Sequence, residues 1–439
     1  MCRESGQTCA DEQEHFRILF HSSGVAILER MPRTDSIQNE ITKARVTLGL
    51  YYSQILDFSS AKKSVDPIVE IATKGGDTRR LSQIYTILGA HDFFLTDDID
   101  AAFRHLGSAL RIAEEIKDVV SLLMGNYWMA VVSAYHCDFD KAFSLFDNSL
   151  RINETANSLW GISIMKSSIS YFVHHFRGDM DAGHRMSHEA VNLAEKSGDS
   201  ISKAMAYASY GSACYGRGLL EDAIQFLSRA VEACERASMP NWNASVHFCL
   251  GESFFDLGSY AKSKSYYAKA ILILEQNKMF PSWTNLNRLA FARAKARNGE
   301  KDVDVRPFCD YVGANRIRLC EGPMARYIGE IFLAMDDQNV PEAEEWVQKA
   351  ISADHRNGLM FHLGRDYRFH AELLYRRREK HAALEAMTRS TEFFRKCGAS
   401  RDIQEAEKAI ATYGLSNVGH VAARVLALGS DAVRSKTDS

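Results

Sequence analysis

Four histidines lie at spacings that could place them around a metal ion. His184 and His188 are four residues apart, so they share one face of a predicted helix, and His174 and His175 lie on the helix before it. Two imidazoles at this spacing, with a third ligand from a neighbouring helix, can hold zinc. No cysteine or second acidic pair is placed to complete such a site. An ordinary polar helix surface explains the four residues better, and we predict no metal ion.

Two glycine pairs have the approximate spacing of a phosphate-binding loop. Such a loop needs Gly-x4-Gly-Lys-Ser/Thr, because backbone amides and the lysine surround the phosphates. Gly183 is followed by His184 and Gly216 by Arg217, so neither segment supplies the lysine. The sequence also contains no Gly-x-Ser-x-Gly nucleophile motif, and His188-Glu189 lacks the second histidine of a zinc-protease helix. We therefore predict a protein without catalytic activity and without a cofactor.

Composition and charge narrow the class of partner. The chain has 439 residues, with 53 lysines and arginines against 56 aspartates and glutamates, a net charge of −3. This balance argues against binding to nucleic acid through global charge, and Arg376-Arg377-Arg378 is better interpreted as a solvated helix end. Neither a long apolar run nor a signal-peptide profile occurs, and the nine cysteines form no Cys-x-x-Cys pair. We expect a cytoplasmic protein with reduced cysteines and no membrane partner.

The elements that carry these residues repeat along the chain. A small residue recurs in steps of forty or forty-one residues, and a second small residue follows most of these positions seven places later, on the same helix face. The first set is Ala61, Ala102, Ala142, Gly183, Ala223, Ser263, Val303, Ala343 and Ala383, and the second is Ile68, Ala109, Ser149, Ala190, Ala230, Ala270, Asp310, Ala350 and Ser390. Small residues at these places let neighbouring helices approach closely. The seventh unit departs from the pattern, and Pro307 predicts that its second helix is delayed or broken.

Gly211, Ala223 and Ala230 show the pattern of one unit: glycine, alanine twelve residues later, and alanine seven after that. This spacing resembles a tetratricopeptide repeat, although the usual period is shorter, about 34 residues. We predict an all-α protein, an α-solenoid of about nine helix-pair repeats with a period of about 40 residues. The solenoid is expected over residues 12–413, with a flexible tail at 1–11 and a short closing helix and disordered tail at 414–439.

A second resemblance is suggested by Gly75-Gly76-Asp77 between two units and by the segment 342–373 near the end of the repeats. The chain looks like the C-terminal repeat region of bacterial signalling ATPases, many of which carry an adenylate or guanylate cyclase domain. In that family the catalytic domains lie upstream and are absent from this sequence, so the resemblance implies a sensor or scaffold role. The helix predicted at 12–30 carries Phe16 and Phe20 and has no partner helix before it. We expect this end to dock an upstream domain or a second copy of the chain.

The inner surface of the solenoid is the predicted partner-binding site, because the first helix of each pair lines the groove of such a stack. Aromatic residues in the middle and basic residues further on would suit a peptide with an apolar stretch and acidic residues. Some of these aromatic residues could instead belong to the core. The predicted groove residues are Tyr127, Phe172, His175, Tyr215, Phe248, Glu252, Phe255, Arg288, Lys295, Arg365 and Arg368.

Two functions remain open at this point. The first is a non-catalytic module that binds a protein, peptide or small effector and acts as a scaffold or regulator in signalling. The alternative is the C-terminal sensor portion of a multidomain ATPase or nucleotide cyclase. A role as a transcription regulator is a less favoured hypothesis, because no helix-turn-helix is recognisable in the terminal segments.

Overall fold

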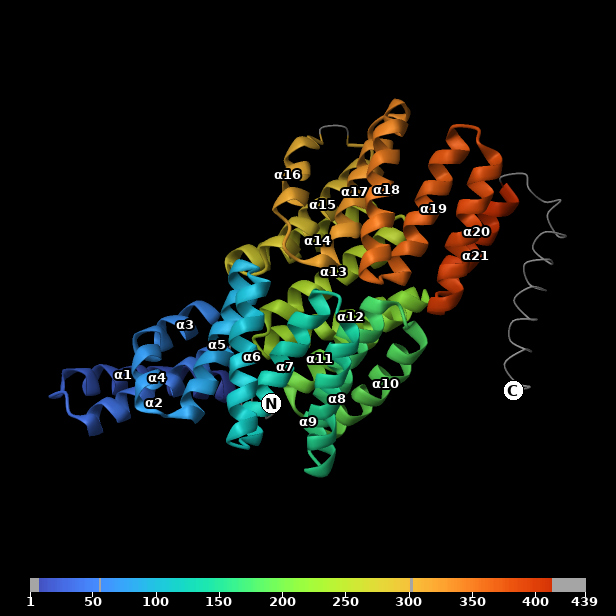
Figure 1. The fold of residues 1–439 in the computed structure, drawn as a ribbon. Coiled ribbons are helices and arrows are strands. Elements are labelled where there is room, and N and C mark those ends of the chain that lie inside the picture. Colours follow the sequence, from blue (N-terminus) through green and yellow to red (C-terminus); the bar gives the residue numbers. More distant parts are fainter. Residues whose placement is uncertain (1–7, 55–56, 301–302, 413–439) are drawn as a thin grey trace, which may run out of the picture.

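The structure is a computed structural model that describes residues 8–54, 57–300 and 303–412, with the side chains of residues 8–17 and 54 left out of the description. Throughout this part of the chain the regular elements are helices, so the predicted all-α fold is confirmed (Figure 1). The elements are α1 (Thr8–Arg30), α2 (Asp35–Gln54), α3 (Phe58–Val65), the 3-10 turn η1 (Asp66–Ile68), α4 (Val69–Gly75), α5 (Thr78–Thr96), α6 (Ile99–Glu115), α7 (Val119–Tyr135), α8 (Phe139–Thr155), α9 (Leu159–Ser168), the π-helical η2 (Ile169–His175), α10 (Met180–Ser197), α11 (Ser200–Arg217), α12 (Leu220–Arg236), α13 (Pro240–Asp256), α14 (Tyr260–Gln276), α15 (Pro281–Arg297), α16 (Arg306–Ala314), α17 (Arg318–Met335), the 3-10 turn η3 (Asp337–Asn339), α18 (Val340–Asn357), α19 (Met360–Arg376), α20 (Lys380–Cys397) and α21 (Ser400–Thr412).

Helices α2 to α20 form nine helix pairs within the described residues, with α1 before them and α21 after them. The predicted small residues lie where the two helices of a pair cross: Ala223 and Ala230 are fully buried. Gly211 on the facing helix is needed for the same reason, because a Cβ atom there would lie 2.7 Å from the Leu227 side chain. The repeated small residues therefore mark the positions where paired helices pack closely, and this repeated packing builds an α-solenoid.

The seventh pair is irregular, as Pro307 predicts. Its second helix, α16, begins only at Arg306 and ends at Ala314, and Pro307 occupies its first turn. Asp310, which replaces a small residue of the register, is exposed. Because α16 begins three residues after Val303, the first position of the register lies outside this helix.

A π-helical segment explains one of the two forty-one-residue steps. Helix α9 continues into η2, where the backbone adopts π-helical geometry from Ile169 to His175. Such a segment accommodates one additional residue without ending the helix. The step from Ala142 to Gly183 spans this segment, so the helix pair keeps its packing although the period is longer there.

The predicted tails at the two ends of the chain lie largely outside the described residues. Helix α1 begins at Thr8 rather than at residue 12, while residues 1–7 and the proposed closing segment at 414–439 lie outside the described residues. Ile18 and Val25 of α1 are buried with Leu48 of α2. None of the described helices combines the length and the apolarity that crossing a bilayer requires.

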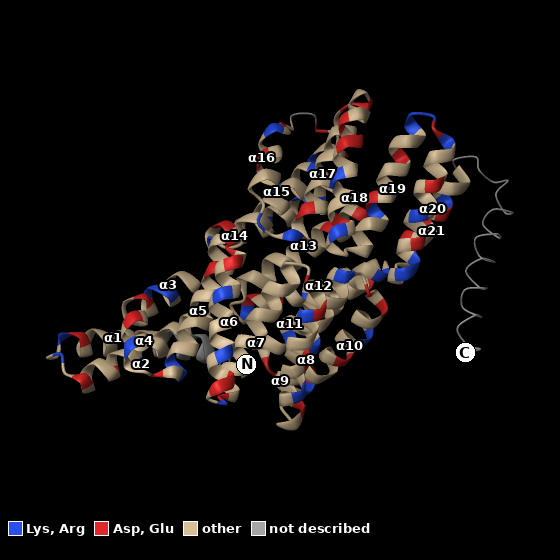
Figure 2. Ribbon diagram, in the orientation of Figure 1, with Lys and Arg blue, Asp and Glu red and all other residues tan. Residues whose placement is uncertain are grey.

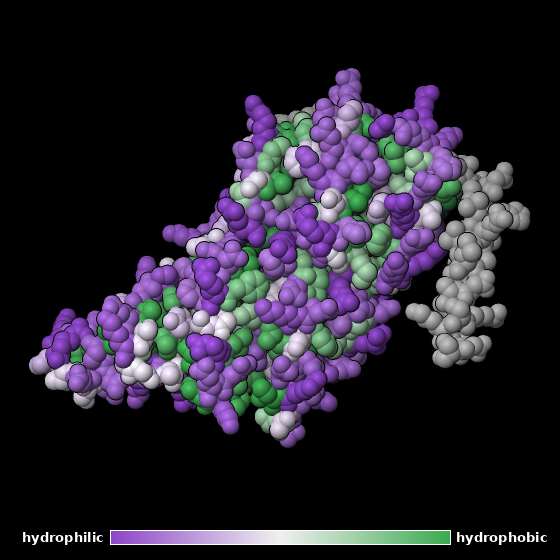
Figure 3. Space-filling model, viewed as in Figure 1, coloured by the Kyte–Doolittle hydropathy of each residue, from purple (hydrophilic) through white to green (hydrophobic). Residues whose placement is uncertain are grey.

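The superhelix closes on itself, so segments far apart in sequence touch. The start of α15 meets the turn between α5 and α6, where the Phe280 amide donates a hydrogen bond to the Phe94 carbonyl at 2.6 Å. Further along, Arg401 Nη2 donates to the Asp256 carbonyl at 2.6 Å. In Figure 1 the later helices α13–α20 accordingly lie as a second tier above α7–α12. Charges of both signs are interspersed along the helices (Figure 2), while apolar side chains surface over the middle of the molecule (Figure 3).

Candidate functional site

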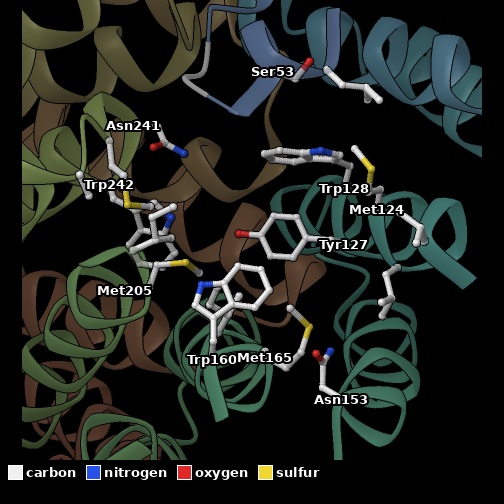
Figure 4. A pocket seen from close by; sticks show the side chains of 18 residues that line it. Ser53, Met124, Tyr127, Trp128, Asn153, Trp160, Met165, Met205, Asn241 and Trp242 are labelled. Carbon is white, nitrogen blue, oxygen red and sulfur yellow. The ribbon is translucent and has the colours of Figure 1, made fainter. Parts of the chain in front are cut away.

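The first helices of the pairs surround an open apolar cavity with a volume of about 420 Å³. Its walls come from α7, α9, α11 and α13, with contributions from α2, the end of α8 and the turn between α12 and α13 (Figure 4). Among the described residues, no charged side chain belongs to the lining, and aromatic and thioether groups dominate it. These side chains include Trp128, Trp160, Trp242, Met124, Met165 and Met205. Such a lining suits an uncharged apolar ligand group.

The rim of this cavity is built by three helix N-termini. Val120, Trp160 and Ile201 each lie two residues after the N-cap of α7, α9 and α11, and their exposed fractions are 55%, 46% and 37%. The caps at Ser158 and Asp199 accept hydrogen bonds from backbone amides of the first turn, which holds these turns in place. The second residue after the N-cap is therefore an apolar, solvent-exposed residue in three consecutive repeats.

Tyr127 is the predicted groove residue that lines this cavity. Its hydroxyl points toward the middle of the cavity in Figure 4. Burial raises the pKa of Tyr127 to about 12, with hydrogen bonds from Ser168 and Trp242 acting in the opposite direction. The hydroxyl is therefore neutral at physiological pH. Phe172 is buried in the core, with its ring centroid 6.0 Å from that of Phe146 and 5.5 Å from that of Trp242.

Five further predicted residues gather around a second, smaller cavity of about 60 Å³: His175, Tyr215, Phe248, Glu252 and Arg365. They come from η2, α11, α13 and α19, helices that are brought together by the closure of the superhelix. Burial and the nearby Arg365 charge lower the pKa of His175 to about 4. This histidine is therefore neutral, and it cannot serve as a counter-charge for the acidic residues nearby.

Glu252 is the centre of a buried polar network. Its Oε1 accepts hydrogen bonds from Arg293 Nη2 at 2.6 Å and from the Tyr327 hydroxyl at 3.0 Å, and the Tyr267 hydroxyl is a further partner. Its Oε2 accepts from the Tyr215 hydroxyl at 3.4 Å and from Arg365 Nη1 at 3.5 Å. A buried carboxylate with this many donors is well compensated. The network joins α11, α13, α14, α15, α17 and α19.

The basic end of the predicted groove is neutralised by acidic residues of the protein itself. Arg365 Nη2 lies 2.6 Å from Asp256 Oδ2, and Arg368 Nη1 lies 2.9 Å from Asp402 Oδ1. Phe255 is covered by the Arg293 guanidinium at 3.7 Å from the ring centroid. These predicted residues therefore stabilise contacts between helices.

The two remaining predicted residues lie elsewhere on α15. Arg288 pairs with Glu275 of α14 at 2.7 Å, and neither Arg288 nor the half-buried Lys295 lines the cavities described above. The predicted groove residues thus lie in four places: Tyr127 lines the apolar cavity, Phe172 belongs to the core, seven belong to the contacts between helices, and Arg288 and Lys295 lie elsewhere on α15.

The histidine cluster packs around an aromatic ring. His184 and His188 lie with their ring centroids 5.0 and 5.6 Å from that of Tyr210. Over residues 8–54, 57–300 and 303–412, no three or more histidine, cysteine or acidic side chains lie together as a set of metal ligands.

The apolar rim residues Val120, Trp160 and Ile201 are not among the groove residues predicted from the sequence. The signal that could have found them is the second position after each N-cap, which is apolar in α7, α9 and α11 but Arg79 in α5 and Asn241 in α13. Aligning these positions requires the exact first residue of each helix, which the sequence pattern does not define.

No family model and no curated protein matches this sequence. Among solved structures, a Rap conjugation gene regulator of the plasmid pLS20 in complex with the Phr* peptide has a TM-score of 0.56 at 12% identity, over 79% of this chain and 92% of that one. A Rap protein complexed with competence and sporulation factor has a TM-score of 0.46 at 11% identity, over 86% and 98%. A signal transduction ATPase with a tetratricopeptide repeat sensor from Pyrococcus horikoshii has a TM-score of 0.47 at 14% identity, over 85% and 55%.

The similarity to the Rap regulator with the TM-score of 0.56 and the repeat geometry define the fold: the chain is a tetratricopeptide-like stack of helix pairs. At these sequence identities the likeness concerns the fold alone.

Proposed function

We propose that this protein is a non-catalytic interaction module that binds a protein or peptide partner at the apolar cavity and thereby acts in regulation. The main observation in support of this proposal is that Val120, Trp160 and Ile201 expose apolar surface to water at the mouth of an uncharged cavity. Covering apolar surface stabilises a complex by about 25 cal/mol for each Å² removed from water. Exposed patches next to a pocket are typical of binding sites.

The similar structures are compatible with this proposal. The Rap regulator with the TM-score of 0.56 is described in complex with a peptide. A cytoplasmic location and the lack of a cofactor, membrane or nucleic-acid partner belong to the same proposal. The ionisable groups on the inner face support the absence of catalysis, because Glu252 and Arg365 are already engaged with each other and with neighbouring side chains. The other predicted groove residues are proposed to hold the helices that shape the cavity.

Site-specific photo-crosslinking in the native host tests this function. A photoreactive phenylalanine analogue at Trp160 or Ile201 is expected to capture a recurrent protein or peptide partner. Leu272 of α14 is the matched control, because it is 53% exposed and lies outside the cavity. Identical capture from all three positions would refute the proposed site.

The second candidate is the sensor portion of a larger signalling ATPase or cyclase, docked through α1. It is favoured by Phe20 and Ile27, which are 66% and 63% exposed on this helix, while the Phe16 side chain lies outside the described residues. Changing Phe20 and Ile27 to serine is expected to weaken self-association or domain docking without lowering the melting temperature. A monomeric wild type that binds no such domain, measured by sedimentation, would remove this candidate.

A further inference from the structure

The walls of the apolar cavity offer few groups that could hydrogen-bond to a ligand. Apart from indole N–H groups, the polar lining side chains are Ser53, Tyr127, Asn153 and Asn241. The Asn153 amide already donates to the Ser149 carbonyl at 2.8 Å. All lining elements are helices or the turns between them, so no strand edge is present among them to pair with a ligand backbone.

This shortage of partners constrains the conformation of a bound chain. Every residue of an extended peptide presents a backbone donor and acceptor, and burying them unpaired costs free energy. A helix satisfies these groups internally. Resting on the proposed function, we propose that the partner contributes an amphipathic helix, which inserts two bulky uncharged side chains one helical turn apart into this cavity.

The size of the site agrees with two such anchors. An apolar cavity of about 150 Å³ is large enough to hold a benzene molecule. The volume of about 420 Å³ therefore has room for two ring-sized groups. Side chains three or four residues apart on a helix lie about 5–6 Å from one another, close enough to share one cavity.

The rim sets the length of the partner helix. It extends over three first helices, α7, α9 and α11, and even directly packed helix axes lie about 8–10 Å apart. The rim is therefore at least about 16–20 Å long, which a helix of about 11–13 residues spans at 1.5 Å per residue. Because no charged side chain of the described residues lines the cavity, a charged anchor would lose its hydration without compensation. The methionines Met124, Met165 and Met205 can adapt to anchors of different shape.

Selection from an unbiased library tests this inference. A displayed library of random peptides of about 16 residues is selected on the full chain and counter-selected on a double variant, Trp160→Glu with Ile201→Glu. Both substitutions lie in the first turn of a helix, where an acidic residue is favourable and the fold is expected to persist. Leu272→Glu is the matched control for an added charge at an exposed apolar position.

The selected peptides are expected to carry large neutral residues at i and i+3 or i+4, and to gain helical circular dichroism when they bind. They should bind the wild type and Leu272→Glu equally, and the double variant at least about tenfold more weakly. A proline between the anchors should weaken binding by about tenfold or more, whereas alanine at the same place should not.

The remaining outcomes separate this inference from the function on which it rests. Cavity-dependent peptides that tolerate proline, or that carry their anchors at i and i+2, would overturn the helical partner and leave the proposed function standing. If no selected peptide distinguishes the wild type from the double variant, the proposed function falls together with the inference.

Discussion

Asp97 caps helix α15 from the other side of the superhelix: its Oδ2 accepts a hydrogen bond from the Ser282 backbone amide at 2.6 Å, although 185 residues separate the two. Asp97 lies at the end of α5, and Ser282 is in the first turn of α15. The N-cap position of α15 itself is Phe280, which offers no side-chain oxygen. A long-range contact thus supplies a cap that local sequence omits, and it ties the early repeats to the later ones.

Replacing Asp97 with alanine is therefore expected to lower the free energy of unfolding by about 0.5–2 kcal/mol, the usual cost of losing a cap. Amide exchange at Ser282 should accelerate at the same time. Asp98 provides the control, because it caps its own helix α6 through the Ala101 amide at 2.9 Å. Asp98→Ala should lower stability while leaving exchange at Ser282 unchanged, and unaltered exchange in Asp97→Ala would contradict the long-range cap.

Two glycines in helix interiors are expected to respond oppositely to alanine. In Gly211→Ala the new Cβ would lie 2.7 Å from the Leu227 side chain and 3.0 Å from its backbone nitrogen, so the crossing must open. We expect a loss of about 1–3 kcal/mol from overpacking. At Gly107 the nearest atom is Met129 Cε at 4.0 Å, and Gly107→Ala should stabilise by about 0.5–1 kcal/mol. Thermal or urea unfolding measures both, and a neutral Gly211→Ala would show that the repeat register does not mark close packing.

Removing the Glu252 carboxylate should destabilise the whole inner face. Glu252→Ala leaves Arg293 and Arg365 without a buried acceptor that both now use, and breaking a buried ion pair in this way costs about 3–5 kcal/mol. Glu252→Gln keeps an acceptor and should cost less. Urea unfolding of the two variants, with a double-mutant cycle against Arg365→Met, measures the coupling. Equal stability of wild type and Glu252→Ala would show that the network contributes little.

Stability near neutral pH should depend on a pair of buried carboxyl groups. Asp354 and Asp366 are both fully buried, and Arg326 Nη1 lies 2.8 Å from Asp366 Oδ1. Burial and the neighbouring Asp366 charge raise the pKa of Asp354, and burial also raises the pKa of Asp366. Raised values mean that the folded protein binds more protons than the unfolded chain between about pH 4 and the raised pKa values. The contribution of this pair to stability should therefore increase as the pH falls through that interval.

Asp354→Asn imitates a permanently protonated Asp354. It is expected to raise the melting temperature at pH 8 and to lose this advantage progressively toward pH 5, because the wild type then acquires the same proton. Asp402→Asn is the comparison for a buried carboxyl group, here paired with Arg368 at 2.9 Å. A difference between wild type and Asp354→Asn that is independent of pH would contradict a raised pKa of Asp354 in the folded protein.

The sequence alone determined most of the helix pairs, because a crossing where paired helices pack closely needs a small side chain and this requirement leaves a visible register, as at Gly211, Ala223 and Ala230. Tyr127 could be placed on the inner face by the same register. Tertiary structure decided which inner residues meet, since closure of the superhelix depends on small rotations between repeats that the period does not record. That closure brings Tyr215 and Glu252 to Arg365, joins Asp97 to Ser282, and leaves Trp160 at the mouth of an open cavity.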